Sequence, residues 1–229
     1  MPFWRYVRHG VEDELAKNGI ECVTYDSKDD ANTQMSNAQD AITKQVDAIV
    51  ISPTDSASCA SVLSLAQESD VPVVICDIGE YVSYISTDNL AGGKAIGEYI
   101  ASQLEAGTEV AQITLNQARI NGVLRKDGFD AGIAENNLVD VDFKQMEKVN
   151  RSEGETYAQD LITAHPNLGA IFCHSEDPAM GAASALEAAG RTDVLIAAFD
   201  CSPEIVEGIR NGSIAGTSAQ QPVLMGRNA

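Results

Sequence analysis

The sequence predicts an α/β protein built from two Rossmann-like lobes, each a parallel sheet flanked by helices. Apolar segments of strand length alternate with amphipathic segments of helix length along most of the 229 residues. The strand segments are continuous apolar runs, such as VVIC at 73–76, because strands covered by helices on both faces carry no polar alternation. The rhythm breaks near residues 78–90, and we therefore expect two similar lobes joined by a hinge.

The N-terminal lobe is expected to span residues 1–87. Apolar residues at every fourth position of segment 3–17 predict a helix, which ends at Gly19. The apolar segment Ile20–Tyr25 predicts a strand. The alternation then continues as a helix at 31–45, a strand at 47–52, a helix at 56–68 and a strand at 71–77.

The C-terminal lobe is expected to span residues 88–221, after a short extended piece at 81–86. Asp88 or Asn89 caps a helix that reaches Leu104. The later elements continue the alternation: strand 109–115, helix 122–136, strand 141–149, helix 152–164, strand 169–174, helix 177–189, strand 194–199, helix 203–210 and strand 213–218.

The two ends of the chain lead us to expect a piece of a longer protein, truncated at both ends. The first element is a helix with no strand before it, so the N-terminal lobe would lack its first strand. Residues 222–229, after the last strand, would be the start of a return to the N-terminal lobe.

The charge of the chain narrows the classes of partner. Acidic residues outnumber basic ones by 34 to 15, which gives a net charge of −19. Nucleic acid and anionic membrane surfaces need a positive field, so we expect neither as a partner. No apolar run approaches the ~18 residues of a membrane span. This composition fits a soluble protein with a small, neutral or cationic ligand.

Motifs for cofactor or catalytic chemistry are missing from the sequence. It has no G-x-x-x-x-G-K-[ST] phosphate loop, no G-x-G-x-x-G, no G-x-S-x-G and no H-E-x-x-H. The five cysteines contain no C-x-x-C pair, and their odd number argues against a disulfide framework. We therefore expect neither an enzyme nor a cofactor, and we expect the cysteines to be core residues, with Cys201 beside Asp200 the one nearest a pocket.

Ligands of open parallel sheets lie beyond the carboxyl ends of the strands. Asp77 and Asp200 each directly follow an apolar strand, where a carboxylate can accept hydrogen bonds from adjacent hydroxyls of a sugar or polyol. The alternative is that each carboxylate caps the following helix. Arg125 lies near the start of a helix, where a cation is unfavourable. Contact with ligand hydroxyls would account for it, and a solvated surface arginine is the alternative.

Two aromatic residues and one histidine cluster complete the candidates. Phe3 lies on the apolar stripe of the first helix, whereas Trp4 lies off it; aromatic faces pack against sugar rings, and a core role is the alternative for Phe3. His174 with Glu176 and Asp177 has the residue types of a metal site, but a solvated loop is the favoured interpretation.

Eight short motifs stand out along the chain: Ser52-Pro-Thr-Asp-Ser56, the strand at 71–77, Ser86–Gly93, Arg125–Phe129, Ala164-His-Pro166, Met180-Gly-Ala182, Phe199-Asp200 and Ala219-Gln-Gln-Pro222. Their order resembles that in the ribose-binding-protein-like periplasmic sugar-binding proteins, the substrate-binding components of bacterial sugar ABC transporters. The resemblance covers essentially the whole chain.

The resemblance implies a type I periplasmic binding fold that closes on one sugar and delivers it to a permease. It implies a monomer in the periplasm or outside the cell, with a membrane-anchored lipoprotein as an alternative. Phe3 and Trp4 match the family's stacking aromatics by position. The positions that match its polar ligand contacts are Asp77, Arg125, Ser175, Asp200 and Gln220.

Three departures from the family pattern argue against ribose itself as the ligand. Ile78 stands where the ribose binder has an arginine, Ser175 where it has an asparagine, and Val149 at about the place of a pocket aromatic. A different pentose, a hexose or a linear polyol would fit these changes. The alternative function is the effector-binding core of a LacI-type transcription regulator, which shares the fold; the Pro-Thr-Asp-Ser turn and the acidity favour the transporter.

Overall fold

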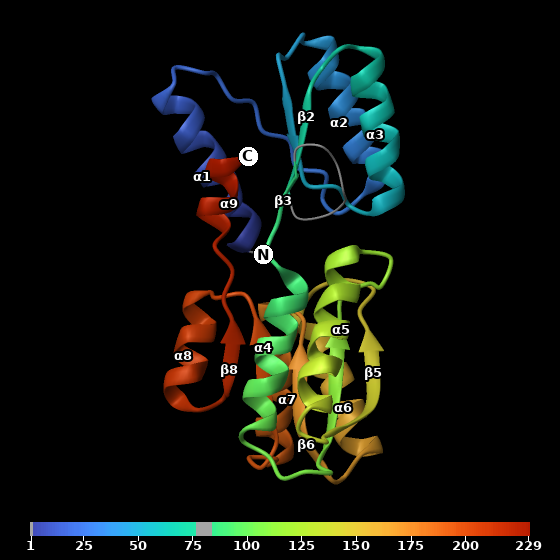
Figure 1. Cartoon of the computed structure of the whole chain (residues 1–229), viewed down its shortest axis with the longest axis vertical. Coiled ribbons are helices and arrows are strands. Elements are labelled where there is room, and N and C mark those ends of the chain that lie inside the picture. The colour runs from blue at the N-terminus through green and yellow to red at the C-terminus, as the bar shows by residue number, and fades with distance from the viewer. Residues whose placement is uncertain (1, 77–83) are drawn as a thin grey trace. The chain divides into compact units, whose positions relative to one another are not determined.

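A computed structural model describes residues 2–76 and 84–229 of the chain (Figure 1). The chain forms two compact units. The first unit comprises residues 1–87, 118–120 and 221–229, and the second unit comprises residues 88–117 and 121–220. Each unit contains an all-parallel sheet with helices against it, which confirms the α/β fold class.

The first unit has a sheet in the order β1-β2-β3. Ile75 and Cys76 are neighbours on β2, so their side chains point to opposite faces of this sheet. Ile75 packs in a core cluster with α2 and α3, whereas Cys76 packs with α1 and α9, so helices cover both faces. The elements are α1 (Pro2–Lys17), α2 (Ala31–Thr43), β1 (Ile49–Ile51), α3 (Ser56–Glu68), β2 (Val73–Cys76), β3 (Tyr84–Ile85) and α9 (Pro222–Asn228).

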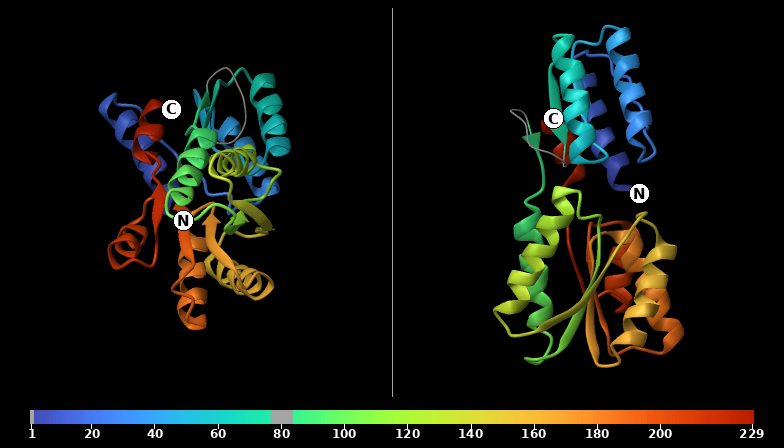
Figure 2. Two further views of the ribbon diagram at one scale, coloured as in Figure 1. Left: turned by 60° about the horizontal axis from the view of Figure 1, so that its bottom comes forward. Right: turned by 90° about the vertical axis from the view of Figure 1, so that its right-hand side faces the viewer.

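The second unit has a five-stranded sheet in the order β5-β4-β6-β7-β8. Alternate residues of its strands pack into two hydrophobic cores, one on each face of the sheet. Ile171 packs with α6 and α7, and Phe172 packs with α4 and α5. The right-hand view of Figure 2 shows these helix pairs on opposite sides of the sheet. The elements are α4 (Asn89–Ala101), β4 (Glu109–Thr114), α5 (Ile120–Ala134), β5 (Val139–Gln145), α6 (Arg151–Ala164), β6 (Leu168–Cys173), α7 (Glu176–Ala189), β7 (Leu195–Phe199), α8 (Pro203–Asn211) and β8 (Gly216–Ser218).

Glycines allow α4 and α5 to pack backbone against backbone. A Cβ atom added at Gly93 would lie 2.4 Å from the carbonyl oxygen of Arg125, and one at Gly128 would lie 2.2 Å from that of Leu90. Both distances are far below any real carbon–oxygen contact. The two helices therefore approach closely at the end where Asn89 and Arg125 lie.

The structure corrects several predictions about elements. Segment 20–25 is not a strand: among the described residues it makes no ladder with β1, and Ile20 and Val23 are exposed. An apolar run becomes a strand only where a neighbouring strand takes its backbone hydrogen bonds. Helix α9 was not foreseen, because seven residues are too few for a clear period. Strand β5 covers 139–145 and not 141–149.

The cysteine prediction is partly wrong. Cys59, Cys76 and Cys173 are buried as expected, but Cys22 and Cys201 are exposed. Cys22 lies in the segment that forms no strand, so no sheet covers it. Among the described residues, no two of these cysteines form a disulfide.

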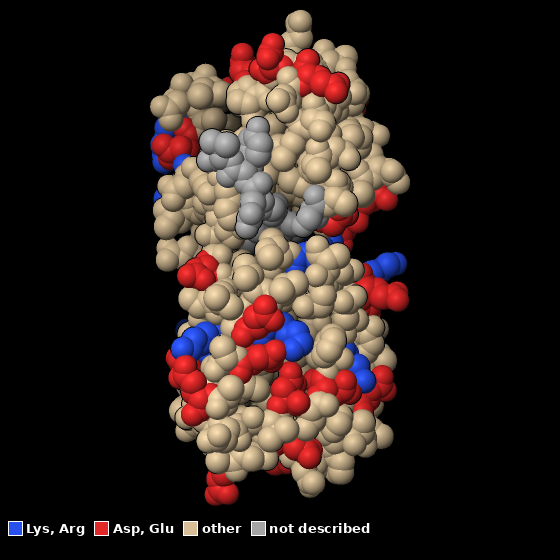
Figure 3. Space-filling model, turned by 45° about the vertical axis from the view of Figure 1, so that its right-hand side comes forward, with Lys and Arg blue, Asp and Glu red and all other residues tan. Residues whose placement is uncertain are grey.

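Acidic and basic side chains lie side by side on the face drawn in Figure 3. One described cation, Lys94 of α4, pairs with Glu135 at 2.7 Å and lies 3.5 Å from Glu98. Within the ranges that the structure describes, no helix is both long and apolar enough to cross a membrane.

Candidate functional site

The sheet of the second unit reverses its winding between β4 and β6. The chain leaves β4 for α5 on one face and leaves β6 for α7 on the other, because the strand order places β4 and β6 side by side. In doubly wound sheets the crevice at this switch point, beyond the carboxyl ends of the strands, is where ligands bind. Arg125, Ser175, Asp200 and Gln220 all belong to this unit.

Arg125 is the buried cation of this site, with only 2% of its surface exposed. Its Nε donates to Oδ1 of Asn89 at 2.8 Å, and one terminal nitrogen donates to the carbonyl oxygen of His174 at 2.5 Å. The guanidinium lies 3.8 Å from the ring centroid of Phe199. Groups from α4, from the end of β6 and from β7 therefore hold it, and the alternative of a solvated surface arginine is wrong.

Asn89 is a site residue that the sequence did not single out. Asp88 is the N-cap of α4 and accepts from the backbone N–H of Ala91 at 2.9 Å. Because the cap is already supplied, the buried side chain of Asn89 is available to hold Arg125. A sequence signal existed: two cap-type residues stand together where one helix start needs only one.

Asp200 is buried and has an unusual backbone, with a φ of 78°. Its backbone N–H donates to the carbonyl oxygen of Ser218 at 3.0 Å, and Gln220 donates its amide to Oδ1 of Asp200. Ser202, not Asp200, caps α8 by accepting from the N–H of Ile205. The capping alternative for Asp200 is therefore wrong, and Asp200 and Gln220 lie together as a hydrogen-bonded pair.

Ser175 is the N-cap of α7 and Glu176 is its first residue, at the carboxyl end of β6. Both side chains are buried, and neither Oγ of Ser175 nor Oε1 of Glu176 has a hydrogen-bond partner among the described residues. Ser175 stands at the N-cap position of α7 but makes no capping bond with its side chain. Burial raises the pKa of the Glu176 carboxyl against the effect of a hydrogen bond from Ser202, and the charge of Asp200 raises it further.

His174 is fully buried, so the interpretation of this stretch as a solvated loop is wrong. Its ring packs against Phe172, with centroids 4.8 Å apart, and Nε2 lies 3.1 Å from Oε1 of Gln112. Burial, together with the charges of Arg125 and Lys126, holds the pKa of His174 well below its usual range. In the described part of the chain, no three His, Cys, Asp or Glu side chains are arranged to hold a metal ion.

A chain of hydrogen bonds fixes the tautomer of His174. The amide nitrogen of Gln112 donates to Asp130 at 2.7 Å and to Asp140 at 2.9 Å, which leaves its oxygen facing His174. Nε2 of the neutral ring must therefore carry the proton and donate it. Asp130 and Asp140 thus orient Gln112, and Gln112 orients the ring of His174. The backbone carbonyl oxygen of His174 accepts a hydrogen bond from Arg125.

Asp140 makes this network sensitive to pH. Burial raises the pKa of Asp140 to about 6 against its hydrogen bond from Gln112, and the charge of Asp130 adds to the rise. The carboxyl binds its proton more tightly in the folded than in the unfolded chain. The bound proton therefore stabilises the folded chain fully below pH 4, and this contribution is lost as the pH rises through about 6.

We expect Asp140→Asn to match the wild-type free energy of unfolding at pH 4 and to exceed it by about 2 kcal/mol at pH 7. The neutral amide keeps the shape of the protonated carboxyl and removes the cost of its ionisation. Urea unfolding at both pH values measures the difference, with the exposed Asp160→Asn on α6 as control. A gain that is equal at both pH values would contradict the assignment.

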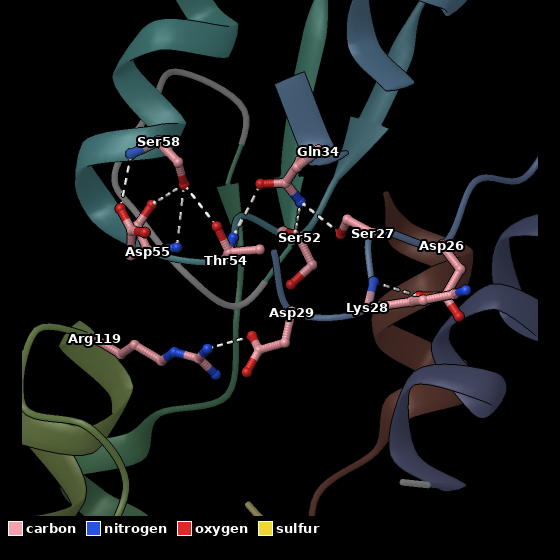
Figure 4. A network of polar contacts seen from close by, with 10 residues as sticks. All are labelled: Asp26, Ser27, Lys28, Asp29, Gln34, Ser52, Thr54, Asp55, Ser58 and Arg119. Carbon is pink, nitrogen blue, oxygen red and sulfur yellow. Dashed lines mark hydrogen bonds and ion pairs between the residues drawn. The ribbon is translucent and has the colours of Figure 1, made fainter. Parts of the chain in front are cut away.

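A separate polar network lies in the first unit, at the carboxyl end of β1 (Figure 4). Gln34 is buried; its amide nitrogen donates to the carbonyl oxygen of Ser52 at 2.9 Å, and its oxygen accepts from the N–H of Thr54 at 3.0 Å. Asp55 caps α3 in a capping box with Ser58. These bonds fix the Pro-Thr-Asp-Ser turn.

The same view shows an ion pair between Asp29 and Arg119, which lies in the short segment 118–120 (Figure 4). Asp29 and Lys28 both have positive φ, at 61° and 52°. Asp26 accepts from the N–H of Lys28 at 2.9 Å and supports this tight turn.

The remaining site predictions concern the first unit. Phe3 is buried against Val7, Cys76 and Met225, and its ring meets that of Trp4 edge-on at 4.9 Å. Trp4 is half-buried. Phe3 therefore has the core role that its place on the apolar stripe suggested, and its contact with a ligand stays a prediction. Asp77 and Ile78 lie outside the described residues.

The whole chain, residues 1–229, matches the periplasmic binding protein domain family. The chain belongs to this family. It is 31% identical to the ribose import binding protein of Escherichia coli (strain K12), over 98% of this chain and 77% of that protein. It is 32% identical to the ribose import binding protein of Bacillus subtilis (strain 168), over 100% of this chain and 75% of that protein.

Solved structures of the periplasmic binding protein family agree with the fold. The Caulobacter myo-inositol binding protein, bound to myo-inositol, aligns with a TM-score of 0.91 and 28% identity over 99% of this chain and 80% of its own. A solute binding protein of an ABC transporter from Mycobacterium smegmatis, with bound glycerol, aligns with a TM-score of 0.90 and 28% identity over the same shares. These relatives are sugar- and polyol-binding proteins of importers, which favours a transport receptor over a transcription regulator.

Proposed function

We propose that this periplasmic binding protein binds a small neutral sugar or polyol and delivers it to the permease of an ABC importer. Arg125, Ser175, Asp200 and Gln220 contact the ligand from the second unit. Phe3, Trp4 and Asp77 stay predicted contacts from the first unit. The protein acts as a monomer in the periplasm or outside the cell, without a cofactor and without catalysing a reaction.

The observation that carries this proposal is that a buried guanidinium and a buried carboxylate lie at the same end of one sheet: Arg125 packs on Phe199, and Asp200 directly follows Phe199. Arg125 offers donors and Asp200 offers acceptors, and hydroxyl groups both accept and donate. Each group is held by protein neighbours, Arg125 by Asn89 and Phe199 and Asp200 by Gln220, so little side-chain entropy is lost on binding.

The charges of the site support an uncharged ligand. Arg125 supplies one positive charge, and Asp200 and Glu176 supply acidic groups close by. An anionic sugar would meet these carboxyl groups in a water-poor environment, where like charges repel strongly. The relatives with bound myo-inositol and bound glycerol agree in ligand class.

A thermal-shift screen tests the function directly. We expect at least one of D-ribose, D-allose, L-arabinose, myo-inositol and glycerol to raise the melting temperature, because a ligand that binds only the folded state stabilises it. The departures at Ser175 and Val149 predict that ribose is not the best of them. A protein whose melting temperature none of these compounds changes, even at about 1 mM, on the order of 1,000 times a micromolar Kd, would contradict the proposal.

Asp200→Asn tests the role of the carboxylate. We expect the best ligand of the screen to bind about tenfold or more weakly by calorimetry, because a hydrogen bond to a charged acceptor becomes one to a neutral amide. Asparagine tolerates the positive φ of this position as well as aspartate does, so the backbone stays unstrained. The exposed Asp127→Asn on α5 is the control, and an unchanged affinity for Asp200→Asn would remove Asp200 from the site.

A further inference from the structure

The start of α7 contains a buried carboxyl group for which the fold gives no use. Glu176 is 4% exposed, yet Oε1 has no hydrogen-bond partner among the described residues. A buried acceptor without a partner destabilises the folded state, because it has lost its hydrogen bonds to water and gained none in the protein. Such groups are few in native proteins and each needs an explanation; a ligand that donates a hydrogen bond to the group is one.

The neighbours of this carboxyl group place it at the sugar site. Helix α7 contacts α8, and Ser202 is the N-cap of α8. The carboxyl group of Glu176 accepts a hydrogen bond from Ser202, and the charge of Asp200 acts on it, so it faces the loop after β7. Ser175, directly before it, is also buried with an unpartnered hydroxyl. His174, one residue earlier, accepts from Arg125 through its carbonyl oxygen. Three consecutive residues thus join the two groups proposed to hold the ligand.

A purely structural role explains Glu176 poorly. An acidic side chain in the first turn of a helix is favourable, but Asp177 already supplies one there with more exposure to water. Glu176 instead lies near a second carboxylate, which raises the cost of its charge. A ligand that donates a hydrogen bond to Glu176 would account for this cost.

We propose that Glu176 is a ligand-recognising residue of the sugar site, where its carboxylate accepts a hydrogen bond from a hydroxyl of the bound sugar or polyol. With Asp200 it gives the second unit two acidic acceptors beside one guanidinium. The site then recognises at least two hydroxyl donors. It binds ligands with adjacent hydroxyl groups more tightly than analogues that lack one of these hydroxyl groups. This inference rests on the proposed function.

The test compares Glu176→Gln and Glu176→Asp with the wild type by calorimetry, using whichever of D-ribose, D-allose, L-arabinose, myo-inositol and glycerol binds the wild type best. We expect both variants to bind that compound about tenfold or more weakly. Glutamine removes the charged acceptor, and aspartate withdraws it by one methylene. The ligand-free melting temperature of Glu176→Gln should equal or exceed that of the wild type, because a buried charge is gone. Glu187→Gln, exposed on the same helix, is the control and should bind as the wild type does.

The outcomes separate recognition from structure. Affinities of both variants within threefold of the wild type would overturn the inference and leave the proposed function intact. Wild-type affinity in Glu176→Asp, with a lower ligand-free melting temperature in Glu176→Gln, would assign Glu176 to the stability of the helix and would also overturn it. A wild type that binds none of the five compounds would overturn the proposed function, and the inference with it.

Discussion

Arg125→Lys is expected to weaken binding of the best sugar or polyol about 100-fold or more. Lysine keeps the positive charge but lacks the planar fork, so it cannot donate to Asn89 and His174 together while stacking on Phe199. A 100-fold loss corresponds to about 2.7 kcal/mol, close to the value of one hydrogen bond to a charged group. Calorimetry on the folded variant measures it.

The control for this prediction is Arg210→Lys on α8, where the arginine is exposed and makes a long ion pair with Glu207 at 3.8 Å. Its affinity should equal that of the wild type. A folded Arg125→Lys protein that binds within threefold of the wild type would show that charge alone is required. The geometry of the guanidinium would then have no role in recognition.

Gly128→Ala is expected to lower the free energy of unfolding by about 2 kcal/mol and to weaken ligand binding as well. The new Cβ would lie 2.2 Å from the carbonyl oxygen of Leu90 and 2.8 Å from the backbone nitrogen of Lys94, so α4 and α5 must move apart. Such overpacking costs about 1–3 kcal/mol or more, which exceeds the ~1 kcal/mol that alanine contributes through helix propensity. Binding suffers because Asn89 and Arg125 lie on these two helices.

Urea unfolding and calorimetry of Gly128→Ala provide the two readouts. Ala131→Gly, at an exposed position of α5, is the matched control and should lose about 1 kcal/mol of stability without a change in affinity. A Gly128→Ala protein as stable as the wild type would mean that the two helices do not need their close approach.

Most of the fold could be predicted from the sequence because the apolar periods are strong. The helix at 56–68 was predicted with the bounds that the structure has, and in the structure a capping box of Asp55 and Ser58 fixes its start. The strand predicted at 20–25 failed for a tertiary reason. Strand formation requires a paired neighbour, and a sequence shows composition but not pairing.

The candidate site was predicted in part. Arg125, Asp200 and Gln220 could be singled out because strand ends and motif order mark them, but their ordinary alternatives stayed open. The structure decided two of these alternatives: the guanidinium of Arg125 is buried, and Ser202 supplies the helix cap that Asp200 could have supplied. Asn89 and Glu176 were not singled out as ligand-site residues, because each stands where a polar residue at a helix start has an ordinary explanation.

The sequence by itself determined the fold class, the family resemblance and the acidic, small-ligand character of this protein, because these depend on period, motif order and composition. Only the tertiary structure decided which polar residues act together. The strand order β5-β4-β6-β7-β8 brings Arg125 to the carbonyl oxygen of His174, 49 residues along the chain, and glycine contacts bring it to Asn89. Burial then sets the protonation of groups such as His174 and Asp140, because the cost of a charge depends on the water around it.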